Sequence, residues 1–528
     1  MTLQSTSLYK EAEEPQLFGL RALACAAYGA LLSFAFPPYG FWPFVVALPL
    51  LFVLVARSPK IKGAFGLGFW FGVAFFAQHL FWLPNSLSEI FGPVAWGIYP
   101  PIVIIVGLFW GSVTGLSRAA GGRGSGTLLL LPALWLLMEW ARAQGPLAFP
   151  WGGIGYLWLG TPLAQTADLA GLYGLSFATL VVAALFAVPF TVTERGRLEH
   201  RTKSLLAVMV GVMISAGGWF YGQNRLAEPL AEPDQEVLLL QGNTDPLGRY
   251  EGTSFDFEIY ADLTVGILRG LESPPDLVIW PEGAAVGPGV QLEGMNGEPW
   301  RLRIRESAAT ASVITGASSG RFNSVFGLAD GRITNRYDKV YLVPYGEGIP
   351  LEGPLNAIYN PIYRSFGLAP SGRLPGDSFV PLTLPNAIAA AYVCYESVFP
   401  QVARNMVAQG AEVLVNISND AWFGVGSGAE QHFAMGTMRA IETRRYLLRA
   451  GNDGITAVID PLGRTTERIP RFAASGLLGE YALSSFLTPY VLYGDWLVVV
   501  LAIYSAPLLL LGLRRRPKPD EAIFISRD

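Results

Sequence analysis

The strongest constraint on this chain is a series of long apolar segments separated by short polar ones. A helix needs about 20 mostly apolar residues to cross the hydrocarbon core of a bilayer. Hydrophobic residues make up 51% of the chain and charged residues only 15%, whereas soluble domains carry about 25% charged residues. We therefore expect an integral membrane protein. The candidate spans are residues 18–36, 42–56, 64–83, 95–117, 126–141, 162–190, 204–221 and 488–513.

The positively charged residues support this count of eight spans because they fall in alternate loops. Lys and Arg cluster after the second, fourth and sixth spans and again after the eighth, as in the run Arg514-Arg515-Arg516. Positive loops stay in the cytoplasm, so both termini are expected inside and the long segment after the seventh span outside. The first sixteen residues lack the basic start and the cleavage site of a secretory signal, so the first span is expected to be retained.

The expected organisation follows from these spans. It comprises a cytoplasmic tail (1–17), a seven-helix membrane domain (18–222), a domain outside the membrane (225–482), an eighth transmembrane helix (488–513) and a second cytoplasmic tail (514–528).

Residues 225–482 have the pattern of a layered α/β domain. Helix-like stretches at 255–270, 300–310 and 429–444 lie between short apolar runs. Continuous apolar strands that alternate with helices predict sheets covered on both faces. The predicted strands lie at 237–240, 277–280, 312–315, 388–393 and 413–416.

Three reactive side chains follow such strand-like runs. Glu282 comes after Trp280-Pro281, Lys339 follows Asp338, and Cys394 follows a run of small and β-branched residues. A lone cysteine at a strand end is more often a packing residue. Together, however, a carboxylate base, an ammonium for the oxyanion and a thiolate nucleophile make a complete acyl-transfer site. Spacing alone does not bring the three together.

The motifs in combination resemble those of the carbon–nitrogen hydrolase (nitrilase) superfamily. They are Trp-Pro-Glu ending at Glu282, Lys339 followed by Pro-Tyr-Gly-Glu ending at Glu347, and Cys-Tyr-Glu starting at Cys394. Downstream, 416–424 and Gln431-His432 fit the membrane branch of the superfamily, and the whole chain resembles the apolipoprotein N-acyltransferase family of bacterial envelopes. This resemblance implies a polytopic α-helical membrane domain plus an αββα nitrilase-like domain outside the cytoplasm.

The resemblance also implies a role for each motif residue. Glu282 would be the general base, Lys339 the oxyanion stabiliser and Cys394 the nucleophile. Supporting or substrate-binding residues would be Glu347, Tyr395, Glu396, Trp422 and Phe423.

The implied reaction is ping-pong. An acyl chain would pass from a phospholipid, typically phosphatidylethanolamine, to Cys394 as a thioester, and then to the α-amino group of a diacylglyceryl-cysteine lipoprotein. The implied location is the bacterial cytoplasmic (inner) membrane, with the catalytic domain in the periplasm. No cofactor is implied.

Several alternatives remain open from the residues. The same triad with water as acceptor would make a membrane-tethered amidase or nitrilase. A transporter would need polar clusters inside the spans, and apart from Glu139 and Arg142 these are nearly bare. That pair is more readily a structural ion pair, or simply exposed at the membrane interface, than a substrate site. Glu396 could orient the backbone rather than assist substrate binding.

Other groups point away from further chemistry. Packing or helix capping is the favoured interpretation of His432, because the triad already has a base. With three histidines and no Cys/His cluster, a metal site is not expected. A net charge of −4 shows no excess of basic residues that would bind nucleic acid.

The long connections 344–378 and 421–430 carry apolar residues such as Ile358 and Phe366, which would either dock on lipid or cap the domain's own core.

Overall fold

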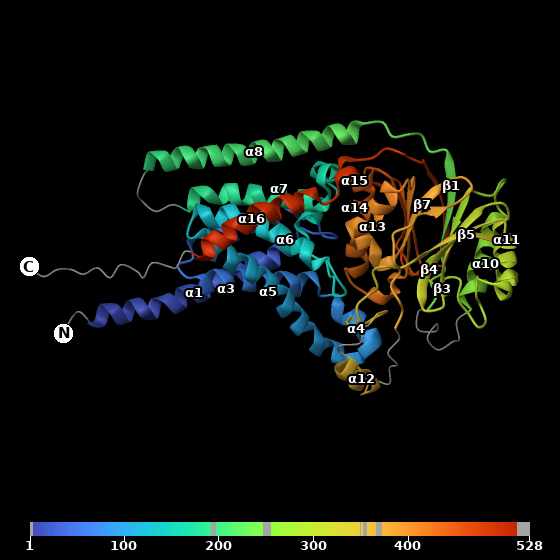
Figure 1. Cartoon of the computed structure of the whole chain (residues 1–528), viewed down its shortest axis with the longest axis horizontal. Coiled ribbons are helices and arrows are strands. Elements are labelled where there is room, and N and C mark those ends of the chain that lie inside the picture. Colours follow the sequence, from blue (N-terminus) through green and yellow to red (C-terminus); the bar gives the residue numbers. More distant parts are fainter. Residues whose placement is uncertain are drawn as a thin grey trace, which may run out of the picture.

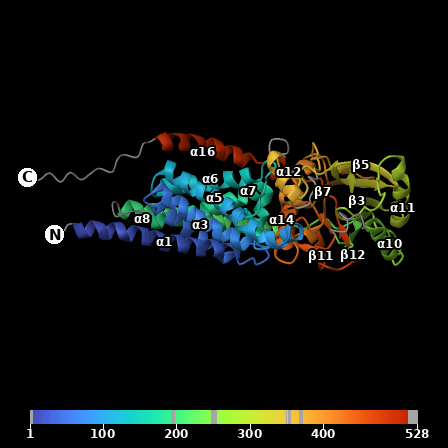
Figure 2. The same ribbon diagram turned by 90° about the horizontal axis from the view of Figure 1, so that it is seen from below.

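The computed structural model describes residues 4–191, 197–245, 255–348, 350–351, 356–365 and 372–514. The molecule is elongated, with a helical bundle at one end and an α/β part at the other (Figure 1). The start of α1 and the end of α16 both lie at the end of the molecule remote from the α/β part (Figures 1 and 2). Ile358 and Phe366, on which the lipid-docking interpretation depends, have side chains outside the described residues.

The bundle contains a helix at each of the eight apolar segments. Among the described residues, five helical stretches are long and apolar enough to cross a membrane: Ile61–His79, Gly92–Gly121, Pro162–Phe190, His200–Ala227 and Trp496–Arg514. Two further apolar helical stretches, Leu17–Ser33 and Trp42–Arg57, are shorter. Membrane helices are therefore confirmed, while the count of eight spans remains a prediction. The helices at the eight apolar segments are α1 (Gln4–Ser33), α2 (Ala47–Arg57), α3 (Ile61–His79), α5 (Ala95–Gly121), α6 (Ser125–Arg142), α7 (Ala167–Ala187), α8 (Arg197–Ala227) and α16 (Trp496–Arg514).

Glycines let the central helices α3 and α5 approach closely. A Cβ placed on Gly68 of α3 would lie 2.1 Å from Oγ1 of Thr114, and one on Gly107 of α5 would lie 2.7 Å from Val73. Small residues at helix interfaces allow this backbone approach in membranes, where lipid supplies little hydrophobic drive for association. Shorter elements of the bundle are α4 (Leu83–Phe91), η1 (Trp42–Val46), η2 (Gly92–Val94), η3 (Ile154–Trp158), η4 (Pro162–Thr166) and η5 (Val188–Phe190).

Two six-stranded sheets form the centre of the α/β part. The first has the order β12-β1-β2-β3-β4-β5 and the second β11-β10-β9-β8-β7-β6. In the first sheet the strands are β1 (Gln235–Gln241), β2 (Leu277–Ile279), β3 (Ser312–Ser319), β4 (Phe322–Ala329), β5 (Arg332–Asp338) and β12 (Ser475–Tyr481). In the second they are β6 (Leu382–Thr383), β7 (Ile388–Val393), β8 (Val413–Ser418), β9 (Leu447–Gly451), β10 (Thr456–Ile459) and β11 (Thr465–Ile469).

The alternation of side chains along β1 explains the layering. Val237 and Leu239 pack in one buried cluster with residues of the second sheet, such as Val415, whereas Leu238 and Leu240 pack in another with helix residues. Successive side chains of a strand point to opposite faces, so the apolar run of β1 serves a sheet–sheet core and a sheet–helix core together.

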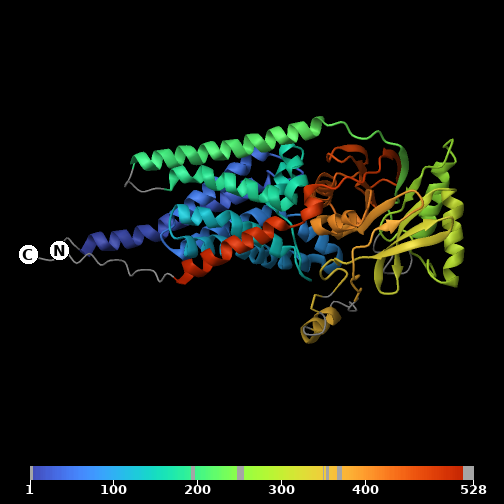
Figure 3. The same ribbon diagram turned by 45° about the horizontal axis from the view of Figure 1, so that its top comes forward.

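Helices cover the outer faces of both sheets, which confirms the predicted αββα fold. Helices α10 (Asp256–Leu268) and α11 (Glu298–Ala308) cover the first sheet, and α13 (Pro400–Ala408) and α14 (Gly428–Thr443) lie between the second sheet and the bundle (Figures 1 and 3). Each predicted strand and helix has a counterpart. The remaining elements are α12 (Asn356–Ser365), α15 (Pro489–Tyr493), η6 (Met295–Gly297), η7 (Cys394–Val398) and η8 (Asp420–Phe423).

A buried carboxylate joins the bundle to the α/β part. Asp168 of α7 bonds Arg225 near the end of α8 at 3.0 Å and Arg444 at the end of α14 at 2.8 Å. The Tyr221 hydroxyl also donates to Asp168 at 2.8 Å. Nearby, the backbone N–H of Leu172 donates to Glu442 at 2.7 Å. These bonds hold α14 against α7 and α8.

Candidate active site

The three predicted reactive residues lie at strand ends of the two sheets. Cys394 follows β7 and Lys339 follows β5 directly, and Glu282 lies three residues beyond β2. β2 and β5 belong to the first sheet and β7 to the second. Nζ of Lys339 lies 3.5 Å from Oε1 of Glu282, and the charges of both residues act on the pKa of the Cys394 thiol. The structure therefore places the three side chains within electrostatic reach of one another.

Lys339 is held by two carboxylates. Its Nζ lies 2.7 Å from Oε2 of Glu347 and 3.5 Å from Oε1 of Glu282. Burial lowers the pKa of the Lys339 ammonium, but Glu347 and Glu282 outweigh burial and raise that pKa above its usual range. Burial raises the pKa of Glu347, and Lys339 with hydrogen bonds from Val343 and Asn323 more than reverses this, so the pKa falls below its usual value. Lys339 is thus a fixed buried cation.

Asn323 of β4 is a site residue that sequence reasoning missed. Its Nδ2 donates to Glu282 at 2.8 Å and to Glu347 at 2.7 Å, which sets the two carboxylates on either side of Lys339. The backbone N–H of Lys339 donates to the carbonyl of Asn323 at 2.9 Å. Nothing in the sequence distinguishes this asparagine from other polar residues in strands.

Cys394 has a left-handed backbone, with φ +49°, and only 9% of its surface is exposed. Burial, and after it the charge of Glu282, raises the pKa of the Cys394 thiol above its usual range, although Lys339 opposes this. A thiol with a raised pKa carries its proton at neutral pH. It therefore needs a base beside it to become a nucleophile.

Glu396 orients the backbone around the site. It is fully buried and accepts hydrogen bonds from the Tyr337 hydroxyl and three backbone N–H groups, those of Val340 at 2.8 Å, Val393 at 2.9 Å and Tyr341 at 3.1 Å. These bonds tie the segment after Lys339 to the segment before Cys394. Burial raises the pKa of Glu396, and its hydrogen bonds from Tyr337 and Val393 oppose this.

Tyr395 and the Trp422–Phe423 segment contact the helical bundle. The Tyr395 hydroxyl donates to the Ala148 carbonyl at 2.6 Å. The Ser86 hydroxyl donates to the Trp422 carbonyl at 2.5 Å, and the Phe423 ring lies 5.1 Å from that of Trp82. Roles of these residues in substrate binding remain predictions, but the contacts place the site against the membrane helices.

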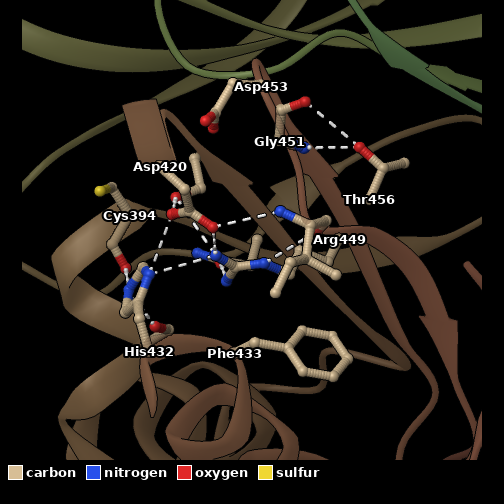
Figure 4. Close-up of polar contacts among 12 residues, drawn as sticks. Cys394, Asp420, His432, Phe433, Arg449, Gly451, Asp453 and Thr456 are labelled. Carbon is tan, nitrogen blue, oxygen red and sulfur yellow. Dashed lines mark hydrogen bonds and ion pairs between the residues drawn. The ribbon is translucent and has the colours of Figure 1, made fainter. Parts of the chain in front are cut away.

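A second buried polar group lies beneath Cys394 (Figure 4). His432 of α14 contacts the Cys394 carbonyl through Nε2 at 3.0 Å and Asp420 through Nδ1 at 3.0 Å. Arg449 of β9 bonds Asp420 at 2.6 Å. Sequence reasoning assigned His432 to packing or capping and did not select Asp420 or Arg449.

Glu139 and Arg142 do not bond each other in the described structure. Glu139 accepts from the Trp135 indole at 3.2 Å and the Ile154 N–H at 3.0 Å, while Arg142 donates to the carbonyls of Phe149 and Trp151. Both serve the fold of the loop after α6. Within the described ranges, no group of three His, Cys, Asp or Glu side chains is arranged to hold a metal ion.

Comparison with known proteins agrees with the two-part architecture. Residues 28–185 match the family model "Apolipoprotein N-acyltransferase N-terminal domain", and residues 261–485 match "Carbon-nitrogen hydrolase". Among solved structures, an amidase from Nesterenkonia sp. is 16% identical with a TM-score of 0.37 and covers 51% of this chain and 97% of its own.

Two curated relatives match nearly end to end. The apolipoprotein N-acyltransferase of Geobacter metallireducens is 32% identical over 92% of this chain and 94% of its own length. That of Azotobacter vinelandii is 32% identical over 96% of this chain and 98% of its own. With the bundle of apolar helices, the αββα fold and this similarity over both parts, the chain belongs to the apolipoprotein N-acyltransferase family and is a membrane acyltransferase of the nitrilase superfamily.

Proposed function

We propose that this enzyme transfers an acyl chain from a membrane phospholipid to the α-amino group of a diacylglyceryl-cysteine lipoprotein, through a thioester on Cys394. Phosphatidylethanolamine is the proposed donor. The observation that carries the proposal is the Lys339 ammonium, 2.7 Å from Glu347 and 3.5 Å from Glu282, with both Lys339 and Glu282 acting on the Cys394 thiol. The names of the curated relatives support the acceptor.

In the first half-reaction the Cys394 thiol gives its proton to Glu282, and sulfur attacks the ester carbonyl of the phospholipid. The Lys339 ammonium stabilises the resulting oxyanion. When the tetrahedral intermediate collapses, the C–O bond breaks and Glu282 returns the proton to the departing alkoxide oxygen, which gives the hydroxyl of the lysophospholipid. The product is a thioester on Cys394.

In the second half-reaction the α-amino group of the lipoprotein attacks the thioester carbonyl. Glu282 takes the amine proton, Lys339 again stabilises the oxyanion, and the C–S bond breaks as the amide forms. Glu282 then protonates the departing thiolate. The raised pKa of the Cys394 thiol favours this last step, because a more basic thiolate is more readily reprotonated.

The contacts of the site with the bundle support a lipid donor. Tyr395, the residue after the nucleophile, bonds Ala148 in the loop after α6, so the thiol lies near the end of the membrane helices. We further propose that residues 18–222 and 488–513 span the inner membrane eight times, that both termini are cytoplasmic and that the α/β part is periplasmic, on the basis of the alternating basic loops.

The deciding experiment uses the purified full-length enzyme in phospholipid. We expect mass spectrometry to find an acyl adduct on the Cys394 peptide, which a synthetic diacylglyceryl-cysteine peptide discharges to give an amide. Cys394→Ala should abolish both. Cys25→Ala is the matched control, since Cys25 is the other cysteine of the chain and is buried in α1. A thioester that water removes without any acylated peptide would contradict the proposed transfer.

A further inference from the structure

The nucleophile has a backbone conformation that its own residue type disfavours. A non-glycine residue in the left-handed region is strained, and this conformation persists only where surrounding contacts impose it. The peptide before Cys394 is held by Glu396, which accepts from the Val393 N–H at 2.9 Å. The peptide after it is held by His432, which meets the Cys394 carbonyl at 3.0 Å.

The geometry at His432 fixes which atom carries the proton. A backbone carbonyl can only accept a hydrogen bond, so Nε2 of His432 must donate to Cys394. In Figure 4 the Cys394 carbonyl points to the imidazole while its sulfur points to the other side. A bond at the carbonyl thus fixes the peptide plane without touching the reactive atom.

The imidazole is itself held rigidly from its other edge. Nδ1 of His432 lies 3.0 Å from Asp420 and 3.1 Å from the Arg449 guanidinium, and Asp420 bonds Arg449 at 2.6 Å. All three side chains are fully buried. Burial raises the pKa of Asp420, but Arg449 and His432 outweigh it, and the pKa lies well below its usual range. Asp420 therefore stays ionised and keeps the ring in place.

Ser397, His432 and Asp420 together have the hydrogen-bond order of a serine-hydrolase triad. The Ser397 hydroxyl lies 2.9 Å from Nε2 of His432. Ser397 is fully buried, however, and Nε2 also faces the Cys394 carbonyl. A buried hydroxyl cannot meet a lipid ester, so this group serves to hold the Cys394 segment.

The residue next to His432 binds the helical bundle. Gln431 accepts from the indole N–H groups of Trp82 at 2.8 Å and Trp151 at 3.2 Å, and donates to the His79 carbonyl at 2.9 Å. Near the start of α14, Gln431 therefore contacts the helical bundle, and the adjacent His432 contacts the carbonyl of Cys394.

We propose that His432 is a positioning residue for the acyl-transfer step: its Nε2–H fixes the carbonyl of Cys394 and thereby aims the thiol between Glu282 and Lys339, and Gln431 anchors it to the membrane helices. This inference rests on the proposed function, because it assumes that Cys394 is the nucleophile.

The test uses two amide variants of the full-length enzyme. The side-chain amide of His432→Gln reaches the place of Nε2 and can still donate to the Cys394 carbonyl. That of His432→Asn matches Nδ1 and reaches only Asp420. Thr437→Val is the matched control, since Thr437 is buried on the same helix and its hydroxyl bonds the Phe433 carbonyl within that helix. The measurement is the single-turnover rate of Cys394 acylation at saturating phospholipid, with thermal unfolding recorded for each variant.

We expect His432→Asn to lower the acylation rate about 10²-fold, the scale of a nucleophile misplaced by about 1 Å, with little change in KM. The acylation rate of His432→Gln should be at least about tenfold higher than that of His432→Asn. Thr437→Val should acylate at the rate of the parent. Gln431→Met should lower the rate by about three- to tenfold, since it removes hydrogen bonds at a distance from the thiol.

Equal acylation rates in the Asn and Gln variants would overturn the inference, and so would rates within about threefold of the parent in both. In either case the rate would not depend on whether a hydrogen bond is donated to the Cys394 carbonyl. If His432→Asn fails to fold, unchanged acylation in Gln431→Met would overturn it. A parent enzyme that forms no Cys394 thioester would instead contradict the proposed function.

Discussion

The two sheets contribute opposite kinds of surroundings to the nucleophile. On the first sheet, Glu282 and Glu347 bracket Lys339 and retain 13% and 14% side-chain exposure. Beside the second sheet, Asp420, His432 of α14 and Arg449 of β9 are fully buried. Both groups are charged and hydrogen-bonded, but only the first is open enough to meet a substrate. The difference separates the groups proposed to do the chemistry from the groups proposed to hold them in place.

The largest expected effect comes from the open side. Lys339→Met removes the cation proposed to stabilise the oxyanion, and we expect acyl transfer to fall by about 10³-fold, the loss seen when an oxyanion donor is removed. The measurement is the single-turnover transfer rate per folded molecule. A transfer rate within tenfold of the parent's would mean that Lys339 has a structural role. The first sheet would then not differ from the second in contributing groups that act on the substrate.

Glu347→Gln should reduce acylation by about 10²-fold by loosening Lys339, and it should also change the response of stability to pH. The folded-state pKa of Glu347 is depressed, so its contribution to stability is present above its unfolded pKa of about 4.3 and is lost as pH falls through the folded value. Thermal unfolding should therefore show a stability gap between parent and variant at pH 7 that narrows at pH 3.5. A gap independent of pH would contradict this.

Asn323→Leu sharpens the comparison further. It removes the amide that donates to both Glu282 and Glu347 but leaves every charged side chain in place. We expect about tenfold slower acylation and a loss of about 1–3 kcal/mol in unfolding free energy from the unpaired acceptors. The control is Asn335→Leu on β5, whose amide donates to the Pro381 carbonyl and whose effect should be on stability alone.

The smallest effect should come from Ser397→Ala on the closed side. The variant removes the hydroxyl that shares Nε2 of His432 but leaves the bond to the Cys394 carbonyl. We expect acylation to fall by less than about threefold, with a loss of about 1 kcal/mol in stability. A drop of 10²-fold in the acylation rate would show that the hydroxyl takes part in the reaction.

The charged residues of the open side could be located from the sequence, whereas Asn323 and the closed side could not. Glu282, Lys339 and Cys394 each follow a recognisable strand, and strand ends are local features. Asn323 lies inside β4, and Arg449 lies inside β9, where the pattern of apolar residues gives no sign of a partner. Their roles depend on which strands lie side by side.

The layers of the fold were predictable for the same reason. The apolar runs of β1, β2, β3, β7 and β8 and the helical stretches are local patterns, whereas the order of strands in the sheets depends on long-range pairing. The bond between Gln431 and Trp82 joins residues 349 positions apart. Such a contact depends on how the bundle and the α/β part pack, which no local pattern encodes.

Asp168 also limits how the enzyme can exchange substrates. It binds Arg225 of α8, the helix that precedes the α/β part, and Arg444 at the end of α14, which carries His432. These buried bonds resist a swing of α14 away from the helical bundle. Under the proposed reaction, donor and acceptor take turns at Cys394, and the departure of the lysophospholipid becomes the event that admits the lipoprotein.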